Sequence, residues 1–81
     1  MNLERVEREN LDALVRGIVR QAAYDWRSAM AILSREPDCG QADRTRKECE
    51  RFFLSDYFHA LTGLDGTMIL NRLKKEFDHV R

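Results

Sequence analysis

Two cysteines and two histidines are the residues of this chain best suited to binding a metal, because thiolates and imidazoles are common metal ligands. They are Cys39, Cys49, His59 and His79. They lie ten, ten and twenty residues apart, without the short C-x-x-C or H-x-x-x-H pair that usually starts a metal site. The spacing therefore predicts no metal site and no cofactor. Both thiols are expected to stay reduced in a cytosol.

The sequence also lacks a recognisable catalytic arrangement. It has no nucleophile elbow, no paired-carboxylate motif and no cysteine–histidine pair with an orienting group. The run Gly63-Leu64-Asp65-Gly66 is superficially similar to a phosphate-binding loop, but helix capping explains all four residues. We therefore predict that the protein is not an enzyme and has no catalytic residue.

Arginine supplies the remaining binding chemistry, since eleven of the fourteen basic residues are Arg. Cations fall at helical spacing in two stripes, and the first stripe borders Tyr24. Guanidinium groups beside an aromatic ring can bind a phosphate or a stacked base. The candidate anion- or ligand-binding residues are Arg16, Arg20, Arg27, Arg44, Lys47 and Arg51. A solvated charged face is the favoured alternative, because acidic residues flank both stripes and the net charge is zero.

A third stripe carries mostly small residues. Val6, Asn10, Ala13, Gly17, Tyr24 and Ala31 lie within about 60° of one another on a helix that turns 100° per residue. Small side chains let a second helix approach closely, and an asparagine can set the register of a symmetric pair. We therefore predict a homodimer whose seam includes this small-residue stripe. The alternative is an exposed face that happens to be small.

Helices are needed to position these stripes. Residues 3 to 35 are predicted to form one long helix, which ends before Pro37 because the residue before a proline avoids the α region. Asp38 is expected to cap a second helix, with Gln41 completing a loose capping box. The predicted inward face of the long helix comprises Leu11, Leu14, Val15, Ile18, Val19, Ala22, Trp26, Ala29, Met30 and Leu33.

Further boundary signals divide the second half of the chain. Ser55 is a typical N-cap, so a kink or a short separate helix is expected up to about Thr62. Gly63 fits the left-handed position after a helix, and Asp65 is expected to cap the last helix. The residues predicted to meet in the core are Trp26, Phe52, Phe58, Leu61 and Leu73. The predicted fold is all-α, a bundle of three main helices in one domain spanning residues 1–81.

The composition favours a cytoplasmic protein that does not enter a membrane. It is 43% hydrophobic and 35% charged, which is too apolar for a disordered chain and too charged for a membrane span. The first ten residues are charged where a signal peptide would need an apolar stretch. Fourteen basic and fourteen acidic residues leave no basic surplus for non-specific nucleic-acid binding. Nucleic acid is therefore a possible partner but not the favoured one.

Residues 50–66 follow the pattern E-R-F-F-x-S-D-Y-F-x-x-L-T-x-L-D-G, which resembles short uncharacterised helical proteins of Firmicutes prophages and mobile elements. The runs I-V-R-Q-A at 18–22 and D-W-R-S-A at 25–29 resemble the same set. The resemblance implies a phage-type accessory protein, and it carries no established activity or functional residue. Small accessory proteins of this kind often bind a host or phage protein, including components of bacterial defence.

These observations lead to one main hypothesis and two alternatives. The main hypothesis is a non-enzymatic helical protein that acts by protein–protein binding, with an unknown host or phage protein as partner and a defence component as one option. The first alternative is a DNA-binding or transcription-modulating module that uses Arg44, Lys47 and Arg51. The second is a capture protein whose oligomer brings Arg16, Arg20, Tyr24 and Arg27 together around a small anionic nucleotide.

Overall fold

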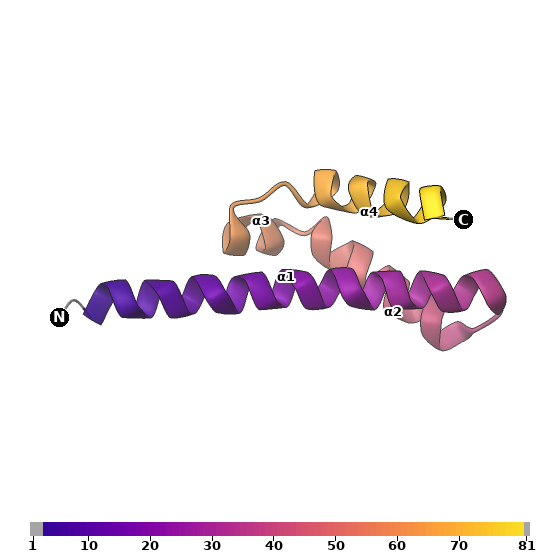
Figure 1. The fold of residues 1–81 in the computed structure, drawn as a ribbon, viewed down its shortest axis with the longest axis horizontal. Coiled ribbons are helices and arrows are strands. Elements are labelled where there is room, and N and C mark those ends of the chain that lie inside the picture. The colour runs from indigo at the N-terminus through magenta and orange to yellow at the C-terminus, as the bar shows by residue number, and fades with distance from the viewer. Residues whose placement is uncertain (1–2, 81) are drawn as a thin grey trace.

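The computed structural model describes the backbone of residues 3–80 and the side chains of residues 10–79. Over residues 3–80 it contains four helices and no strand (Figure 1). They are α1 (Leu3–Arg35), α2 (Gly40–Phe53), α3 (Asp56–Thr62) and α4 (Gly66–Val80). The all-α prediction is confirmed. The predicted second helix is divided into α2 and α3, so the bundle has four helices instead of three main ones.

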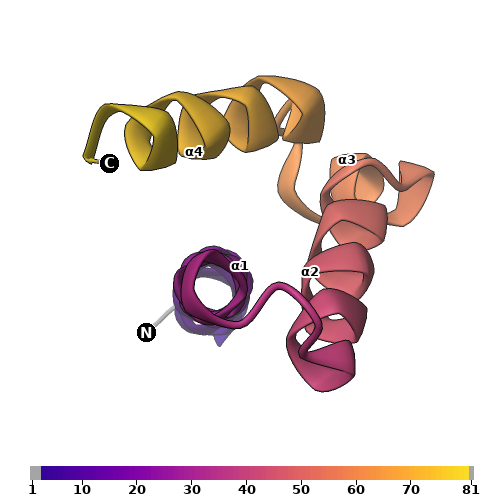
Figure 2. The same cartoon turned by 90° about the vertical axis from the view of Figure 1, so that its right-hand side faces the viewer.

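The long helix α1 is the axis of the molecule. Its 33 residues extend about 50 Å at 1.5 Å per residue, and the molecule measures 53 × 23 × 21 Å. The chain returns along α1 as α2, turns through α3, and runs forward again as α4 (Figure 1). Viewed along α1, α2 lies on one side and α4 on another, and the remaining sides carry no helix (Figure 2). The side view shows that the N-terminal part of α1 extends beyond the other three helices (Figure 1).

The start of α2 differs from the prediction. Asp38 was expected to be its cap, but α2 begins at Gly40 and the capping position is Cys39, whose side chain makes no capping hydrogen bond. The reason is the turn after Pro37, in which the Cys39 N–H donates to the Glu36 carbonyl at 3.0 Å. This bond leaves Cys39 in extended backbone directly before the helix. Asp38 lies one residue before the capping position, and its side chain is exposed.

The break between α2 and α3 is produced by Ser55, as predicted. Ser55 has extended backbone angles (φ −79°, ψ 151°), and its hydroxyl accepts a hydrogen bond from the Phe58 N–H at 3.0 Å. The same hydroxyl donates to the Phe52 carbonyl at 2.7 Å, so one side chain serves the end of α2 and the start of α3. The chain therefore changes direction at Ser55 while both helix ends keep hydrogen-bond partners.

The core lies where α1, α2, α3 and α4 meet around three fully buried aromatic rings. Trp26 and Phe58 are 0% exposed and Phe53 is 1% exposed. The buried cluster comprises Trp26, Cys49, Phe53, Phe58, Leu70 and Leu73. The prediction was right for Trp26, Phe58 and Leu73. It was wrong in placing Phe52 and Leu61 in the buried centre, because Phe52 is half-buried against the cluster and Leu61 lies outside it.

The turn between α3 and α4 is capped by residues that the sequence predicted. Gly63 has a φ of 70°, and the Asp65 carboxylate accepts hydrogen bonds from the N–H groups of Thr67 at 3.0 Å and Met68 at 3.4 Å. Replacing Asp65 by alanine removes both bonds, so we expect the free energy of unfolding to fall by ~1 kcal/mol. Urea denaturation measures this, with Asp65→Asn as a control that keeps a capping oxygen. Equal loss in both variants would contradict the capping role.

Candidate functional site

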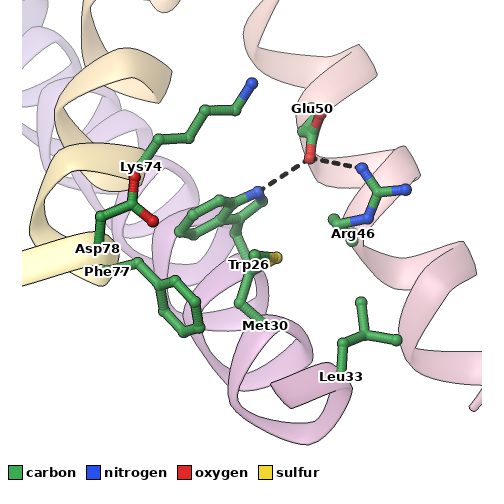
Figure 3. Close-up of a pocket in the computed structure, with 8 residues that line it drawn as sticks. All are labelled: Trp26, Met30, Leu33, Arg46, Glu50, Lys74, Phe77 and Asp78. Carbon is green, nitrogen blue, oxygen red and sulfur yellow. Dashed lines mark hydrogen bonds and ion pairs between the residues drawn. The ribbon is translucent and has the colours of Figure 1, made fainter. Parts of the chain in front are cut away.

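A cleft with a volume of about 370 Å³ lies where α1, α2 and α4 meet. Figure 3 shows side chains from all three helices converging on it. The residues that line it are Trp26, Met30, Leu33, Arg46, Glu50, Lys74, Phe77 and Asp78. We call it the tryptophan cleft. Its apolar residues come from the C-terminal half of α1 and from α4, and its charged residues stand on α2 and α4.

Aromatic and aliphatic side chains form the floor of the tryptophan cleft. The rings of Trp26 and Phe77 pack edge to face, with their centroids 6.1 Å apart and their planes at 80°. Met30 and Leu33 follow one and two turns after Trp26 on the same face of α1 and are half-buried. A floor of this composition favours contact with apolar groups.

A hydrogen-bond network links the rim of the cleft to its floor. The Glu50 carboxylate accepts from the Trp26 indole N–H at 3.2 Å and from Arg46 at 3.0 Å. Arg46 also donates to Asp43 at 2.8 Å, and Lys47 lies 2.9 Å from the same carboxylate. Hydrogen bonds from Arg46 and Lys47 hold the pKa of Asp43 below its ordinary value, and those to Asp43 and Glu50 raise the pKa of Arg46. The network therefore joins α1 to α2.

This bonding limits what the tryptophan cleft can bind. The indole N–H and two guanidinium nitrogens of Arg46 are already used within the protein. Lys74 and Asp78 stand on the α4 side of the rim, and no ion-pair partner is found for either among the described side chains. Ligand sites usually combine an apolar pocket with a few polar groups that fix orientation. The floor of the cleft therefore suits an apolar side chain, and Lys74 and Asp78 are the charged groups on its rim that are left to contact it.

The cysteines and histidines do not form a site in the described part of the chain. No group of three or more His, Cys, Asp or Glu residues within it is arranged to hold a metal ion. Cys49 is buried in the core, and its burial, with Asp25, Glu48 and Glu50 nearby, raises the pKa of its thiol. A raised pKa disfavours the thiolate, which is the reactive form. Cys39 is half-buried at the start of α2.

The structure gives the predicted cationic residues different surroundings. Arg27 lies 2.9 Å from Glu76 and joins α1 to α4, and Lys47 is paired with Asp43. Arg44 and Arg51 are exposed on α2. The other two members are Arg16 and Arg20, and they line a groove of about 400 Å³ beside the turn that follows α3. The apolar lining of that groove comprises Leu11, Val15, Val19, Leu61 and Leu64.

The predicted inward face of α1 is only partly covered, which corrects the sequence-based expectation. Leu11, Leu14 and Ile18 are 55%, 61% and 36% exposed, whereas Ala29, further along the same face, is 2% exposed. The physical reason is length, because the apolar pattern continues for two turns beyond the point where α2 ends. We call Leu11, Leu14 and Ile18 the apolar edge. Isolated exposed apolar residues are common, but a row along one helix face often marks a binding surface.

The small-residue stripe predicted to form a dimer seam lies at the surface. Asn10, Ala13, Gly17, Tyr24 and Ala31 are exposed, and a Cβ added at Gly17 would meet no atom within 4 Å. Val6, the remaining member of the stripe, lies outside the residues whose side chains are described. The stripe is therefore open to a partner over its described length. It borders the apolar edge, since Gly17 and Leu14 are about 60° apart around α1.

Sequence reasoning placed Trp26, Met30 and Leu33 on the inward face of α1 but missed the polar residues of the tryptophan cleft. Arg46 and Glu50 were not singled out, although they have the i,i+4 spacing of a helical ion pair. That spacing was the available signal. Their connection to Trp26 joins residues 24 positions apart, and only the packing of α2 on α1 creates it.

Comparison of this chain with protein-family models, with curated proteins and with solved structures finds no match. Within residues 3–80, no helix is both long enough and apolar enough to span a lipid bilayer.

Proposed function

We propose that the chain is a small, non-enzymatic cytosolic protein that acts by binding other proteins, and that it assembles as a homodimer through α1. The observation that carries this proposal is the apolar edge. Leu11, Leu14 and Ile18 continue the α1 face that α2 covers further along, but Leu11 and Leu14 are more than half exposed and Ile18 is 36% exposed. Covering such a row of side chains with a second helix removes apolar surface from water, which favours association.

The total exposed surface supports assembly of the chain. A compact monomer of 9.5 kDa exposes about 5,000 Å². This chain exposes 6500 Å², an excess of roughly 1,500 Å² over that monomer. A standard protein–protein interface buries about 800 Å² on each partner. The radius of gyration is 15.1 Å, whereas a compact domain of this length has about 12 Å, so the chain is elongated and exposes extra surface. The excess surface is large enough for a dimer interface.

The position of the apolar edge refines the predicted dimer seam. The small-residue stripe alone offers little apolar area, but it borders the apolar edge along α1. A partner helix over Leu14 can contact Ile18 and Leu11 on one side and approach the Gly17 backbone on the other. Leu14 is therefore placed at the centre of the seam, with Asn10 and Gly17 at its border.

The wider role that we propose is binding to a host or phage protein. The resemblance of residues 18–29 and 50–66 to short proteins of Firmicutes prophages supports this class of partner, including a component of bacterial defence. In a dimer joined at the apolar edge, the tryptophan cleft lies on the C-terminal half of α1 and stays accessible. DNA binding and nucleotide capture remain untested predictions.

Replacing Leu14 by glutamate tests the dimer. We expect the dissociation constant of the dimer to rise by ~tenfold or more, because the variant would bury a charge at the centre of the seam. Sedimentation velocity at tens of micromolar measures the mass of the wild type and the variant. Ala31→Glu is the control, since Ala31 is exposed on α1 about 25 Å along the helix from Leu14 and about 100° around it. A monomeric wild type, or a Leu14→Glu protein that associates as tightly as the wild type, would contradict the proposal.

A further inference from the structure

We propose that the groove beside the turn after α3 binds an amphipathic helix of a partner protein, with acidic side chains of that helix against Arg16 and Arg20. We call it the arginine groove. The proposal rests on the proposed protein-binding role and specifies the chemistry of the partner, and it does not depend on the homodimer. It is argued from the dimensions of the groove, its apolar lining and its charge.

The arginine groove lies between α1 and the turn that joins α3 to α4, and its volume is about 400 Å³. Its lining runs along α1 from Leu11 to Arg20, which is about 14 Å at 1.5 Å per residue. Around α1, Val19 lies near the middle of the groove, with Leu11 about 80° to one side and Arg20 about 100° to the other. The groove is therefore apolar at one border and cationic at the other, and it is as long as about two and a half turns of a helix.

The apolar side chains of the arginine groove are incompletely covered. Leu11 is 55% exposed and Leu64 is 46% exposed, while Val15, Val19 and Leu61 are half-buried. An amphipathic helix presents apolar side chains three and four residues apart on one face, and laying that face into a hydrophobic groove is a common mode of peptide recognition. Such a helix would remove the exposed apolar surface of the groove from water.

The groove is poorly suited to a nucleotide. None of its described lining residues is aromatic, so a base would have no ring to stack on. The hydroxyl of Thr62 already donates to the Phe58 carbonyl at 2.8 Å and accepts from the Leu64 N–H at 3.0 Å. The polar edge of a base would therefore find few partners along the groove, whereas apolar side chains would fit.

The charge of the groove favours an acidic partner. Arg16 and Arg20 stand one turn apart, and neither forms an ion pair among the described side chains. Asp12 also lines the groove, so two arginines and one aspartate give a net charge of +1. Guanidinium groups bind carboxylates through paired N–H donors. Both arginines lie about 120–180° around α1 from the apolar edge, so the proposed dimer leaves them uncovered.

Selection of peptides tests the proposal without assuming how the partner helix is aligned in the groove. The probe is a displayed library of random peptides of about sixteen residues, long enough for a helix of several turns, selected on the immobilised wild-type protein. We expect the selected peptides to carry apolar residues three and four positions apart, with glutamate or aspartate beside them. Fluorescence anisotropy then measures the dissociation constant of a synthetic copy of the most enriched peptide.

Charge reversal tests the cationic border of the groove. At physiological salt, Arg16→Glu/Arg20→Glu should raise the dissociation constant by ~tenfold or more, because repulsion replaces attraction. Arg44→Glu/Arg51→Glu is the matched control. It makes the same change of charge at exposed positions of α2, and it should leave the constant within about threefold of the wild type because distant exposed charges are screened.

Shortening a leucine tests the apolar lining. Leu64→Ala should weaken binding of the peptide by ~tenfold, since it removes apolar area from the groove. Leu54→Ala is the control, because Leu54 is 56% exposed but does not line the groove. In about 1 M NaCl the effect of the arginine variant should shrink and that of Leu64→Ala should persist. Circular dichroism confirms that each variant is helical.

The contrary outcomes separate this site from the wider proposal. A selected peptide that binds the arginine and Leu64 variants as tightly as the wild type occupies another surface, which would overturn this site and leave the protein-binding role intact. Failure to select any binding peptide would also overturn it, while sedimentation still tests the homodimer separately. Stabilisation of the wild type against heat by millimolar ATP, lost in Arg16→Glu/Arg20→Glu, would instead assign the groove to a nucleotide and overturn the proposal.

Discussion

Replacing Phe58 by alanine should lower the free energy of unfolding by ~3–5 kcal/mol, a large share of what a domain of this size has. The ring is 0% exposed. Its centroid lies 5.2 Å from that of Phe52 and 5.4 Å from that of Phe53, both in edge-to-face packing. The substitution removes these contacts and leaves a cavity that three helix ends cannot all move to fill. Urea denaturation, or the shift in melting temperature, measures the loss.

The neighbouring Tyr57 provides the matched control for Phe58. It is also aromatic and also in the first turn of α3, but it is 66% exposed. Tyr57→Ala should therefore change the free energy of unfolding by only about 0.5 kcal/mol. Similar losses in the two variants would show that the aromatic cluster is not the centre of the core.

Replacing Gly66 by alanine should destabilise the fold by about 3 kcal/mol or more, although it adds a single methyl group. Gly66 is buried at the start of α4, and a Cβ there would overlap the carbonyl group of Phe53 and lie 3.1 Å from the Phe58 ring. Because the first clash is with backbone atoms, no side-chain rotation can relieve it. The start of α4 would have to move away from the end of α2. Thermal denaturation followed by circular dichroism measures the effect.

Gly17 is the control for this substitution. It lies inside α1 with no atom within 4 Å of an added Cβ, so alanine should fit without strain. Gly17→Ala should stabilise the protein by ~1 kcal/mol, since alanine is the better helix former. If Gly66→Ala were as stable as the wild type, close contact between α2 and α4 would not be what requires glycine at this position.

The helix boundaries after residue 50 were predictable because they depend on local chemistry. Ser55 caps α3, Gly63 ends it and Asp65 caps α4 through bonds that reach no more than three or four residues along the chain. Such bonds are encoded by neighbouring residues and need no information about the packing of helices. Asp38 is the exception, because a turn stabilised by the Glu36 carbonyl moved the cap one residue onward.

Features that depend on packing between helices were not predictable in the same way. The pattern of α2 did not decide between Phe52 and Phe53, because adjacent rings lie on nearby faces and the position of α4 selects Phe53 for burial. The apolar pattern of α1 predicted which face of the helix points inward. It did not predict how far along that face the other helices would cover it. Leu14 is exposed because α2 ends too early to reach it. The bond from Trp26 to Glu50 likewise exists only in the folded arrangement.

The tryptophan cleft gives the protein a built-in optical reporter. Trp26 is the only tryptophan in the chain, and it is fully buried with its indole N–H bonded to a carboxylate. The emission of an indole shifts to longer wavelength when water reaches it, so one fluorescence signal follows the junction of α1, α2 and α4. A molecule that enters the cleft would perturb this signal at the floor. Association at the apolar edge, two or more helical turns away, would leave it unchanged, and the two events can therefore be followed separately without a label.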